Sequence, residues 1–153
     1  MAWAIEKQKY SAQKAQLMFL GEYKIKFSGN GRIVLPSKMR EQLGQSLAIL
    51  SRGFEGCIFG FSPEGFEKEF NRQLEISATE ERARYLRRYL FSGSVPVELD
   101  SQGRFVIPSA LLTFAKLKEE VTIIGAGDHF EIWDQVNWQK HIKEVEENYR
   151  RGL

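Results

Sequence analysis

Two stretches of alternating apolar and polar residues predict a pair of β-hairpins in this chain. In the first stretch, residues 23–27 place Tyr, Ile and Phe on one face, and a period of two is typical of a half-buried strand. The Ser-Gly-Asn-Gly loop at 28–31 supplies residues that tolerate the positive φ of a tight turn. Residues 32–35 then return as a β-branched strand, which Pro36 ends because proline has no N–H to give a ladder.

The same pattern returns 72 residues later. The stretch 31–36 reads Gly-Arg-Ile-Val-Leu-Pro, the stretch 103–108 reads Gly-Arg-Phe-Val-Ile-Pro, and an alternation over 95–99 precedes the second copy. Each copy is followed by a predicted short helix and two predicted strands: 37–44, 47–50 and 57–61 in the first half, and 109–117, 121–124 and 129–133 in the second. A full-length tandem duplication of one small unit explains this match.

Three longer helices are also predicted. Ser62 caps the first, and its buried face is expected to consist of Phe66, Phe70 and Leu74. Ser77 has the spacing of a capping box with Glu80, which predicts a bridging helix over 77–91. Asp134 caps the last helix, whose apolar face is expected to consist of Trp138, Ile142, Val145 and Tyr149.

These elements predict an α+β fold built from two pseudo-twofold-related units, each a β-hairpin with a short helix. Together the units are expected to form a double-split or swapped-hairpin β-barrel with peripheral helices, burying faces that neither could bury alone. The expected division is an N-terminal extension at 1–17, a first unit at 18–76, the bridging helix at 77–91, and a second unit with the C-terminal helix at 92–153. The extension is read either as a short helix or as a non-native or disordered leader, and it is assigned no function.

Composition narrows the class of protein. The chain of 153 residues is 42% hydrophobic, which is ordinary for a folded protein and too apolar for a disordered one. No run of about 18 apolar residues predicts a membrane span, and the N-terminal lysines and glutamines do not resemble a signal peptide. The single cysteine, Cys57, excludes an internal disulfide. We therefore expect a cytoplasmic protein.

The net charge of +2 hides an asymmetry along the chain. Residues 1–40 hold eight Lys/Arg against two Glu, a balance of +6, whereas residues 41–80 hold three against seven, a balance of −4. An anionic partner such as nucleic acid is therefore drawn to the region of the first motif copy. Basic side chains flanking that copy could neutralise phosphate, although for any one lysine the solvated face of a strand or short helix is the favoured interpretation: Lys24, Lys26, Lys38 and Arg40.

The arginine that follows each turn is the sharpest chemical feature. Arg32 and Arg104 each open a return strand beside a loop of small polar residues. The planar guanidinium can grip O6 and N7 of guanine or clamp a phosphate. A single exposed arginine after a turn is common, but two related copies favour a repeated DNA site.

At this point the chain resembles the MraZ family of bacterial regulators, which are associated with the division and cell-wall gene cluster. The resemblance rests on four runs in the family's order: Met18-Phe19-Leu20-Gly21-Glu22-Tyr23, Gly31 to Pro36, Asp100-Ser101-Gln102-Gly103-Arg104, and His129-Phe130-Glu131-Ile132-Trp133-Asp134. Each half is similar to an AbrB-type swapped-hairpin unit. The resemblance implies a ring-shaped oligomer that binds short G-rich direct repeats in promoter DNA.

The resemblance also implies a DNA-reading motif of Asp, three residues, then Arg. The second copy has it as Asp100 and Arg104, whereas the first copy has Ser28 in place of the acid and keeps Arg32. An aspartate can accept turn N–H bonds and orient the arginine, which serine does less well. The candidate DNA-binding residues are Arg32, Arg104, Asp100, Ser28, Asn30, Gly31, Gly103, Lys26 and Lys38.

Two other groups of residues could carry a function. The predicted bridging helix carries Arg82, Arg84, Arg87 and Arg88, which either form a nucleic-acid surface or cover apolar surface with their stems. Cys57 and His129 occupy equivalent repeat positions, and a thiol beside an imidazole could be a nucleophile. A cysteine within an apolar run is usually a small core residue, so we predict no catalytic residue.

We therefore predict a sequence-specific DNA-binding regulator located at the nucleoid. Its expected partners are double-stranded promoter DNA and further copies of itself, with no membrane, small-molecule substrate, metal or cofactor. The alternative is an oligomeric protein-interaction scaffold or antitoxin-like module that contacts DNA only non-specifically.

Overall fold

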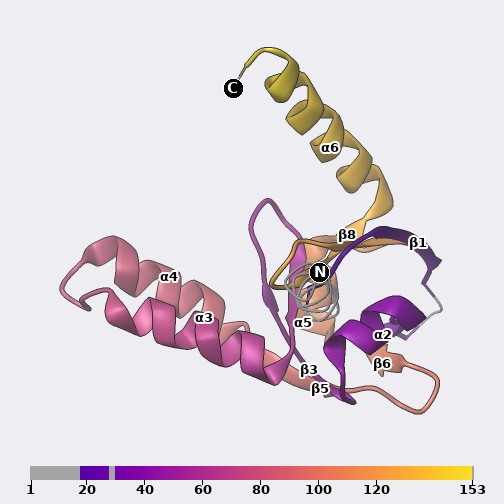
Figure 1. The fold of residues 1–153 in the computed structure, drawn as a ribbon, viewed down its shortest axis with the longest axis horizontal. Helices are drawn as coiled ribbons and strands as arrows, with labels where there is room; N and C mark the ends of the chain where they lie inside the picture. The colour runs from indigo at the N-terminus through magenta and orange to yellow at the C-terminus, as the bar shows by residue number, and fades with distance from the viewer. Residues whose placement is uncertain (1–17, 28–29, 153) are drawn as a thin grey trace, which may run out of the picture.

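The fold is known from a computed structural model that describes residues 18–27 and 30–152. The predicted extension at 1–17 and Ser28 lie outside the described residues. Figure 1 shows the course of the chain, whose elements are β1 (Glu22–Lys26), β2 (Arg32–Val34), α2 (Ser37–Leu43), β3 (Leu47–Arg52), β4 (Ile58–Phe61), α3 (Pro63–Glu75), α4 (Glu81–Ser92), β5 (Val95–Glu98), β6 (Arg104–Val106), α5 (Ser109–Ala115), β7 (Glu120–Gly125), β8 (Phe130–Asp134) and α6 (Gln135–Arg150).

The strands form two antiparallel sheets in which the halves of the chain interleave. The larger sheet has the order β1-β7-β8-β4-β3-β5, and the smaller is a two-stranded ribbon of β2 and β6. Four ladders join one half to the other: β1·β7, β2·β6, β3·β5 and β4·β8. Only β3·β4 and β7·β8 lie within one half. The α+β class and the two interlocked units are thus as predicted, and closure into a barrel stays a prediction.

A pseudo-twofold axis passes through the two ladders that pair a strand with its own counterpart. In β2·β6, Ile33 lies opposite Phe105, and in β4·β8, Phe59 lies opposite Glu131. Both pairs are 72 residues apart, as the sequence repeat requires. The third strand departs from this spacing, because the ladder geometry makes Leu50 of β3 equivalent to Ile123 of β7, which is 73 residues away. The 72-residue spacing of the motif copies therefore does not extend to β3 and β7, which the ladders align at a spacing of 73 (123 − 50 = 73).

The two strands of each predicted hairpin do not form a ladder with each other. β1 pairs with β7 and β2 with β6, so the two strands of the first predicted hairpin belong to different sheets. The second hairpin is split in the same way between β3·β5 and β2·β6. The reason is burial: exchanging partners lets each return strand cover its apolar side chain with the other half of the molecule.

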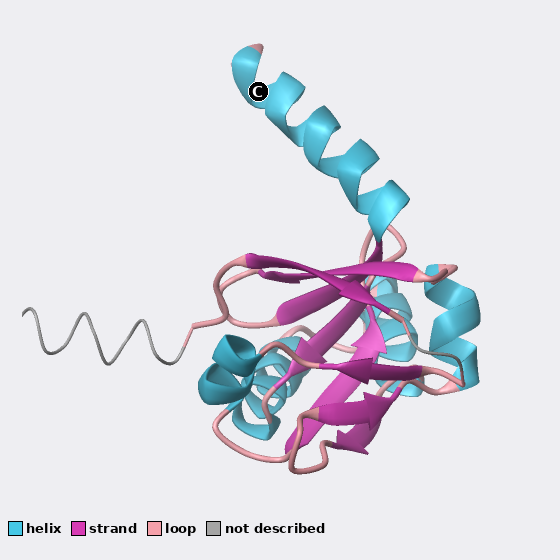
Figure 2. Ribbon diagram, turned by 90° about the vertical axis from the view of Figure 1, so that its right-hand side faces the viewer, coloured by secondary structure: helices cyan, strands magenta, loops and turns pink. Residues whose placement is uncertain are grey.

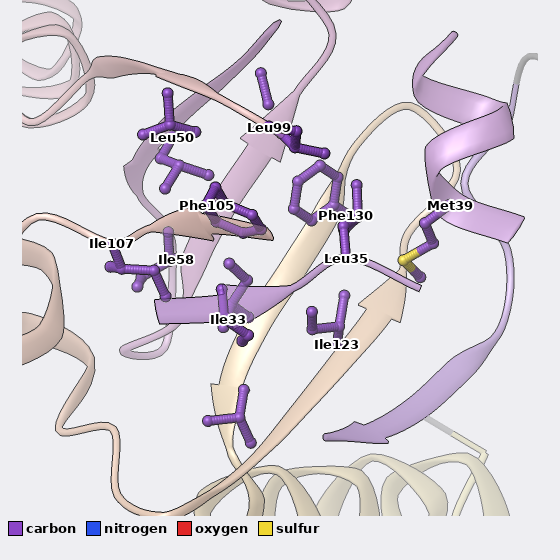
Figure 3. Packing of buried hydrophobic residues seen from close by; sticks show 14 of the residues in the cluster. Ile33, Leu35, Met39, Leu50, Ile58, Leu99, Phe105, Ile107, Ile123 and Phe130 are labelled. Atoms are coloured by element: carbon purple, nitrogen blue, oxygen red, sulfur yellow. The ribbon is translucent and has the colours of Figure 1, made fainter. Parts of the chain in front are cut away.

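Both motif copies supply the centre of the main core. Ile33, Leu35 and Ile107 are at most 1% exposed, and Phe105 is 3% exposed. Figure 3 shows them packed among side chains of the larger sheet and α2, including Leu50, Ile58, Ile123, Phe130 and Met39. The buried apolar positions of the repeated motif therefore stabilise the fold. The positions that alternate with them are exposed and are available to contact a partner.

The helix α3 begins as predicted but does not pack as predicted. Ser62 Oγ accepts a hydrogen bond from the N–H of Gly65 at 3.0 Å, which caps the helix. Phe66 packs against the core, but Phe70 is 39% and Leu74 48% exposed. The expected apolar face is wrong beyond Phe66, because the end of α3 packs on α4 and extends past the sheet (Figure 1).

The helix α4 begins later than the capping-box spacing predicted. It starts at Glu81 without a side-chain cap, because Ser77 Oγ accepts instead from the N–H of Thr79 at 3.2 Å within a turn. The predicted helix over 77–91 is therefore Glu81–Ser92 in the structure.

The last helix, α6, is capped by Asp134, whose Oδ2 accepts from the N–H of Asn137 at 3.3 Å. Trp138 is buried and Ile142 partly buried, whereas Tyr149 is 75% exposed. Only the first part of the predicted apolar face is covered, and the rest of α6 projects from the body (Figure 2). None of the described helices is both long and apolar enough to cross a membrane.

Candidate nucleic-acid interface

The ribbon of β2 and β6 presents two arginines on one outward face. Because side chains alternate along a strand, Ile33 and Phe105 point into the core while the flanking residues are exposed. Arg32 lies opposite Val106, and Arg104 lies opposite Val34. The two arginines thus stand diagonally across the ribbon, with their Cα atoms roughly 8 Å apart by ideal strand spacings. They line one surface hollow of about 470 Å³.

Two valines share this face, and the sequence prediction missed them. Val34 is 39% and Val106 51% exposed. They occupy the alternate positions of the repeated Gly-Arg-apolar-apolar motif, which the sequence pattern predicted to be a β-branched strand without saying which of its side chains face outward. Strand alternation relative to the buried Ile33 and Phe105 is the signal that could have shown them to face outward.

Asp100 organises the second loop. Its Oδ1 accepts from the backbone N–H of Gln102 and of Arg104, both at 2.9 Å, and its Oδ2 accepts from Arg104 Nε at 2.7 Å. The N–H of Gly103 closes the turn on the carbonyl of Asp100 at 2.9 Å. These bonds, that of the Arg104 N–H first, hold the pKa of the Asp100 carboxyl below its usual range. The predicted orientation of the arginine by the acid four residues earlier is thus present in the geometry.

The first loop has a different backbone. Asn30 and Gly31 both lie in the left-handed region, with φ of 71° and 77°, whereas in the second loop only Gly103 does, with φ of 80°. Gly31 also approaches the partner strand, since a Cβ there would lie 2.8 Å from the carbonyl oxygen of Ile107. The described parts of the two loops therefore differ in backbone conformation.

A third arginine reaches the second loop from the other half of the chain. A Cβ on Gly103 would lie 2.3 Å from Cδ of Arg40, which comes from α2. The equivalent contact at the first loop is between Gly31 and Leu112, the residue 72 positions after Arg40. The Arg40 Nε is buried and has no hydrogen-bond partner in the described part of the chain. The interlocked strands thus bring a basic residue of the first half to the second loop.

The two predicted lysines lie in different settings. Lys26 is exposed at the end of β1, opposite Glu120 of β7, so its charge has an acidic neighbour. Lys38 is exposed in the first turn of α2, directly after β2. Of the two, Lys38 has the setting that better suits contact with a phosphate.

The arginines of α4 include two that hold the helical hairpin together. Arg84 donates to the carbonyl of Ala78 at 2.9 Å and to that of Thr79 at 3.0 Å. Arg87 donates to the carbonyl of Gln73 at 3.1 Å and also binds the last carbonyls of α3. Arg84 and Arg87 thus have a structural role, although it is carried by their guanidinium groups, and the predicted covering of apolar surface by their stems stays a prediction.

The thiol and imidazole that share a repeat position do not form a nucleophilic pair. His129 binds Asp128 through Nδ1 at 2.7 Å and Glu131 through Nε2 at 2.8 Å. Cys57 is fully buried and donates to the carbonyl of Phe54 at 3.3 Å. Burial, together with the Glu131 carboxylate, raises the pKa of the thiol far above its ordinary value, so it stays protonated.

The fold and this face define a class of protein, a tandem unit of interlocked hairpins with an arginine-bearing ribbon at its axis. The family described as "MraZ protein, putative antitoxin-like" matches residues 18–89 and again residues 90–151. The chain belongs to the MraZ family, as its motifs predicted.

Individual relatives can also be named. The chain is 36% identical over 132 residues to the Transcriptional regulator MraZ of Ligilactobacillus salivarius (strain UCC118), with 86% of this chain and 92% of the relative covered. Among solved structures, the solution structure of PHS018 from Pyrococcus horikoshii matches with a TM-score of 0.33 and 17% identity, covering 73% of this chain and 94% of that one.

Proposed function

We propose that this protein regulates transcription by binding promoter DNA sequence-specifically, at short G-rich direct repeats. The observation that carries the proposal is the outward face of the β2·β6 ribbon, where Arg32 and Arg104 stand on neighbouring strands over one hollow. The name of the Ligilactobacillus salivarius relative supports the regulatory role. The family resemblance directs the proposal to the bacterial division and cell-wall gene cluster and to a nucleoid location.

The ribbon has the dimensions and chemistry for the major groove, which admits a two-stranded β-ribbon. Each arginine can bind O6 and N7 of a guanine with both arms of its guanidinium. Val34 and Val106, exposed between them, suit the methyl group of thymine. Lys38 and Arg40 would then reach the phosphates beside the ribbon and fix its orientation.

An oligomer is part of this proposal, because one copy with a net charge of +2 offers little general attraction to DNA. Several ribbons held in one assembly would bind several repeats at once, which multiplies affinity without new contacts. The projecting half of α6, with Tyr149 exposed, supports such an assembly. The family resemblance implies that it is a ring.

A second candidate function follows from the family's description as "putative antitoxin-like". On that alternative, the chain is an interaction module whose exposed helices bind protein and whose ribbon contacts DNA without sequence preference. Binding that depends on salt but is equal for all duplexes would favour it.

The test is a titration of the full chain against a G-rich repeat duplex and a scrambled duplex of the same composition. Arg32→Ala and Arg104→Ala should each reduce the preference for the repeat by about 1–3 kcal/mol, because each removes a bidentate base contact. Arg82→Ala, which removes the same charge from an exposed position on α4, should leave the preference unchanged. Selection of bound sequences from random duplex DNA would identify the operator.

Retention of full discrimination by both Arg32→Ala and Arg104→Ala would show that the ribbon does not read bases. A loss of equal size in Arg82→Ala would point to general charge rather than to this face.

A further inference from the structure

A second cavity lies between the α3–α4 hairpin and the larger sheet, and none of its lining residues belongs to the β2·β6 ribbon. It encloses about 370 Å³, near the lower end of the 300–1,000 Å³ that small-molecule pockets occupy. Its walls are largely aromatic, formed by Phe54, Phe59, Phe61, Phe66 and Phe91. The rings contact one another at their edges, with centroids of Phe61 and Phe66 5.8 Å apart. This cavity takes no part in the proposed DNA contact.

Acidic groups dominate the polar part of the cavity. Four carboxylates line it against two basic groups: Glu55, Glu69, Asp128 and Glu131 against Arg72 and His129. Arg72 pairs with Glu69 at 2.8 Å and His129 with Asp128 and Glu131, so the lining keeps a net negative charge even with the histidine protonated. Glu131 is held by Trp133 Nε1 at 2.9 Å and by His129 Nε2 at 2.8 Å. Burial raises the pKa of Glu131, but these bonds outweigh it and lower the value, so the carboxylate is ionised.

One lining residue carries a polar atom that lacks its partner. Gln73 is 7% exposed, and its Nε2 donates to Glu69 Oε1 at 2.9 Å. Because a carboxylate accepts and cannot donate, this bond fixes which end of the amide is the oxygen. Gln73 Oε1 is then buried with no hydrogen-bond partner among the described residues, a costly arrangement unless a donor is supplied.

The aromatic walls, the carboxylates and the unpartnered amide oxygen all favour the same kind of ligand, an organic cation with N–H groups. Aromatic faces attract cations, the carboxylates favour positive charge, and the unpartnered amide oxygen needs an N–H donor. The described residues contain no group of three His, Cys, Asp or Glu placed to hold a metal ion, and the apolar walls call for an organic body. We propose that the cavity binds a small protonated amine with an aromatic or branched aliphatic body. Its ammonium lies toward Glu69, Glu131 and Gln73, and its apolar part lies among the phenylalanines.

The experiment measures binding to the full chain by calorimetry, without DNA. Three probes of nearly equal size separate charge from shape: phenethylammonium, phenethyl alcohol and phenylacetate. The ammonium should bind at least about tenfold more tightly than the neutral and anionic probes, as expected for the loss of one charge-assisted contact. Because no DNA is present, the result does not depend on the proposed function.

Two variants locate the site. Leu86→Phe adds bulk at the cavity wall and should abolish ammonium binding, and Gln73→Leu should weaken it about tenfold by removing the acceptor. Gln139→Leu makes the same chemical change on the exposed face of α6 and should bind as the unmodified chain does. Far-UV circular dichroism and the thermal midpoint verify that each variant is folded.

Equal binding of the three probes, or binding of none, would overturn the proposal. So would undiminished ammonium binding by a folded Leu86→Phe variant, which would place the amine elsewhere on the molecule.

Discussion

The four-residue spacing of Asp100 and Arg104 has a local and a long-range consequence. Locally, one carboxylate holds both the turn N–H groups and the guanidinium, as the sequence motif predicted. The long-range part, the packing of Arg40 on Gly103, could not be predicted. A repeat pattern relates Arg40 to Leu112 but does not reveal that each belongs against the loop of the other half.

Gly103→Ala is expected to destabilise the protein more than Gly127→Ala. Both glycines have positive φ, +80° and +91°, so alanine costs about 1–2 kcal/mol of backbone strain at each. A Cβ at Gly127 meets nothing within 4 Å, whereas one at Gly103 lies 2.3 Å from Arg40 Cδ. Urea unfolding of the two variants measures the difference in the free energy of unfolding.

Gly127→Ala serves as the control for strain alone. Equal losses of stability in the two variants would mean that Arg40 moves aside at no cost. In that case Arg40 would not be a fixed part of the second loop.

The first residues of α3 and α4 show when local sequence is sufficient to predict where a helix begins and when it is not. Ser62 and Ser77 both have sequence contexts that indicate a cap. Only Ser62 caps a helix, because Pro63 follows it in the first helical position, while the side chain of Ser77 binds within its own turn. The exposure of Phe70 and Leu74 was equally beyond a periodicity argument, since the pattern gives the face of a helix but not how far its packing surface extends.

Ser62→Ala should lower the free energy of unfolding by about 1 kcal/mol, the usual effect of removing a side-chain cap. Ser77→Ala should change it by less than half as much, because that hydroxyl lies in an exposed turn and holds no helix end. Chemical denaturation of both variants provides the comparison. A larger loss for Ser77→Ala would contradict the helix boundaries described here.

For the molecule as a whole, the duplication was readable from the residues themselves, whereas the choice of partner for each strand was not: the swapped-hairpin prediction drew on the family resemblance. Gly-Arg-apolar-Pro at a spacing of 72 predicted two related units. The same alternation in β1 would satisfy pairing with either β2 or β7, because a half-buried strand does not specify its neighbour. The observed choice is made by the core, where Ile33 and Phe105 meet on the pseudo-twofold axis.

The proposed oligomer can be tested by measuring the mass of the assembly in solution. Light scattering should give a mass of several chains at concentrations that bind DNA, since part of the apolar stripe of α6 has no cover in its own copy. Tyr149→Glu should raise the dissociation constant of the assembly at least about tenfold by placing a charge on that stripe. Gln139→Glu, a matched charge on the exposed side of α6, should have little effect. A stable monomer at these concentrations would refute the oligomer.

The interlocked ladders also govern when this protein can fold during its synthesis. Ile25 of β1 pairs with Val121, which is 96 residues later (121 − 25 = 96). At about 5–20 residues per second, a ribosome needs roughly 5–20 s to bridge that gap. Until then β1 has no partner strand. β2 has none until β6 is made, because Ile33 pairs with Phe105, which is 72 residues later (105 − 33 = 72), and before that the buried side chains of Ile33 and Leu35 lack this cover. The nascent first half is therefore the state most exposed to aggregation, and its sheet completes only when the second half has emerged.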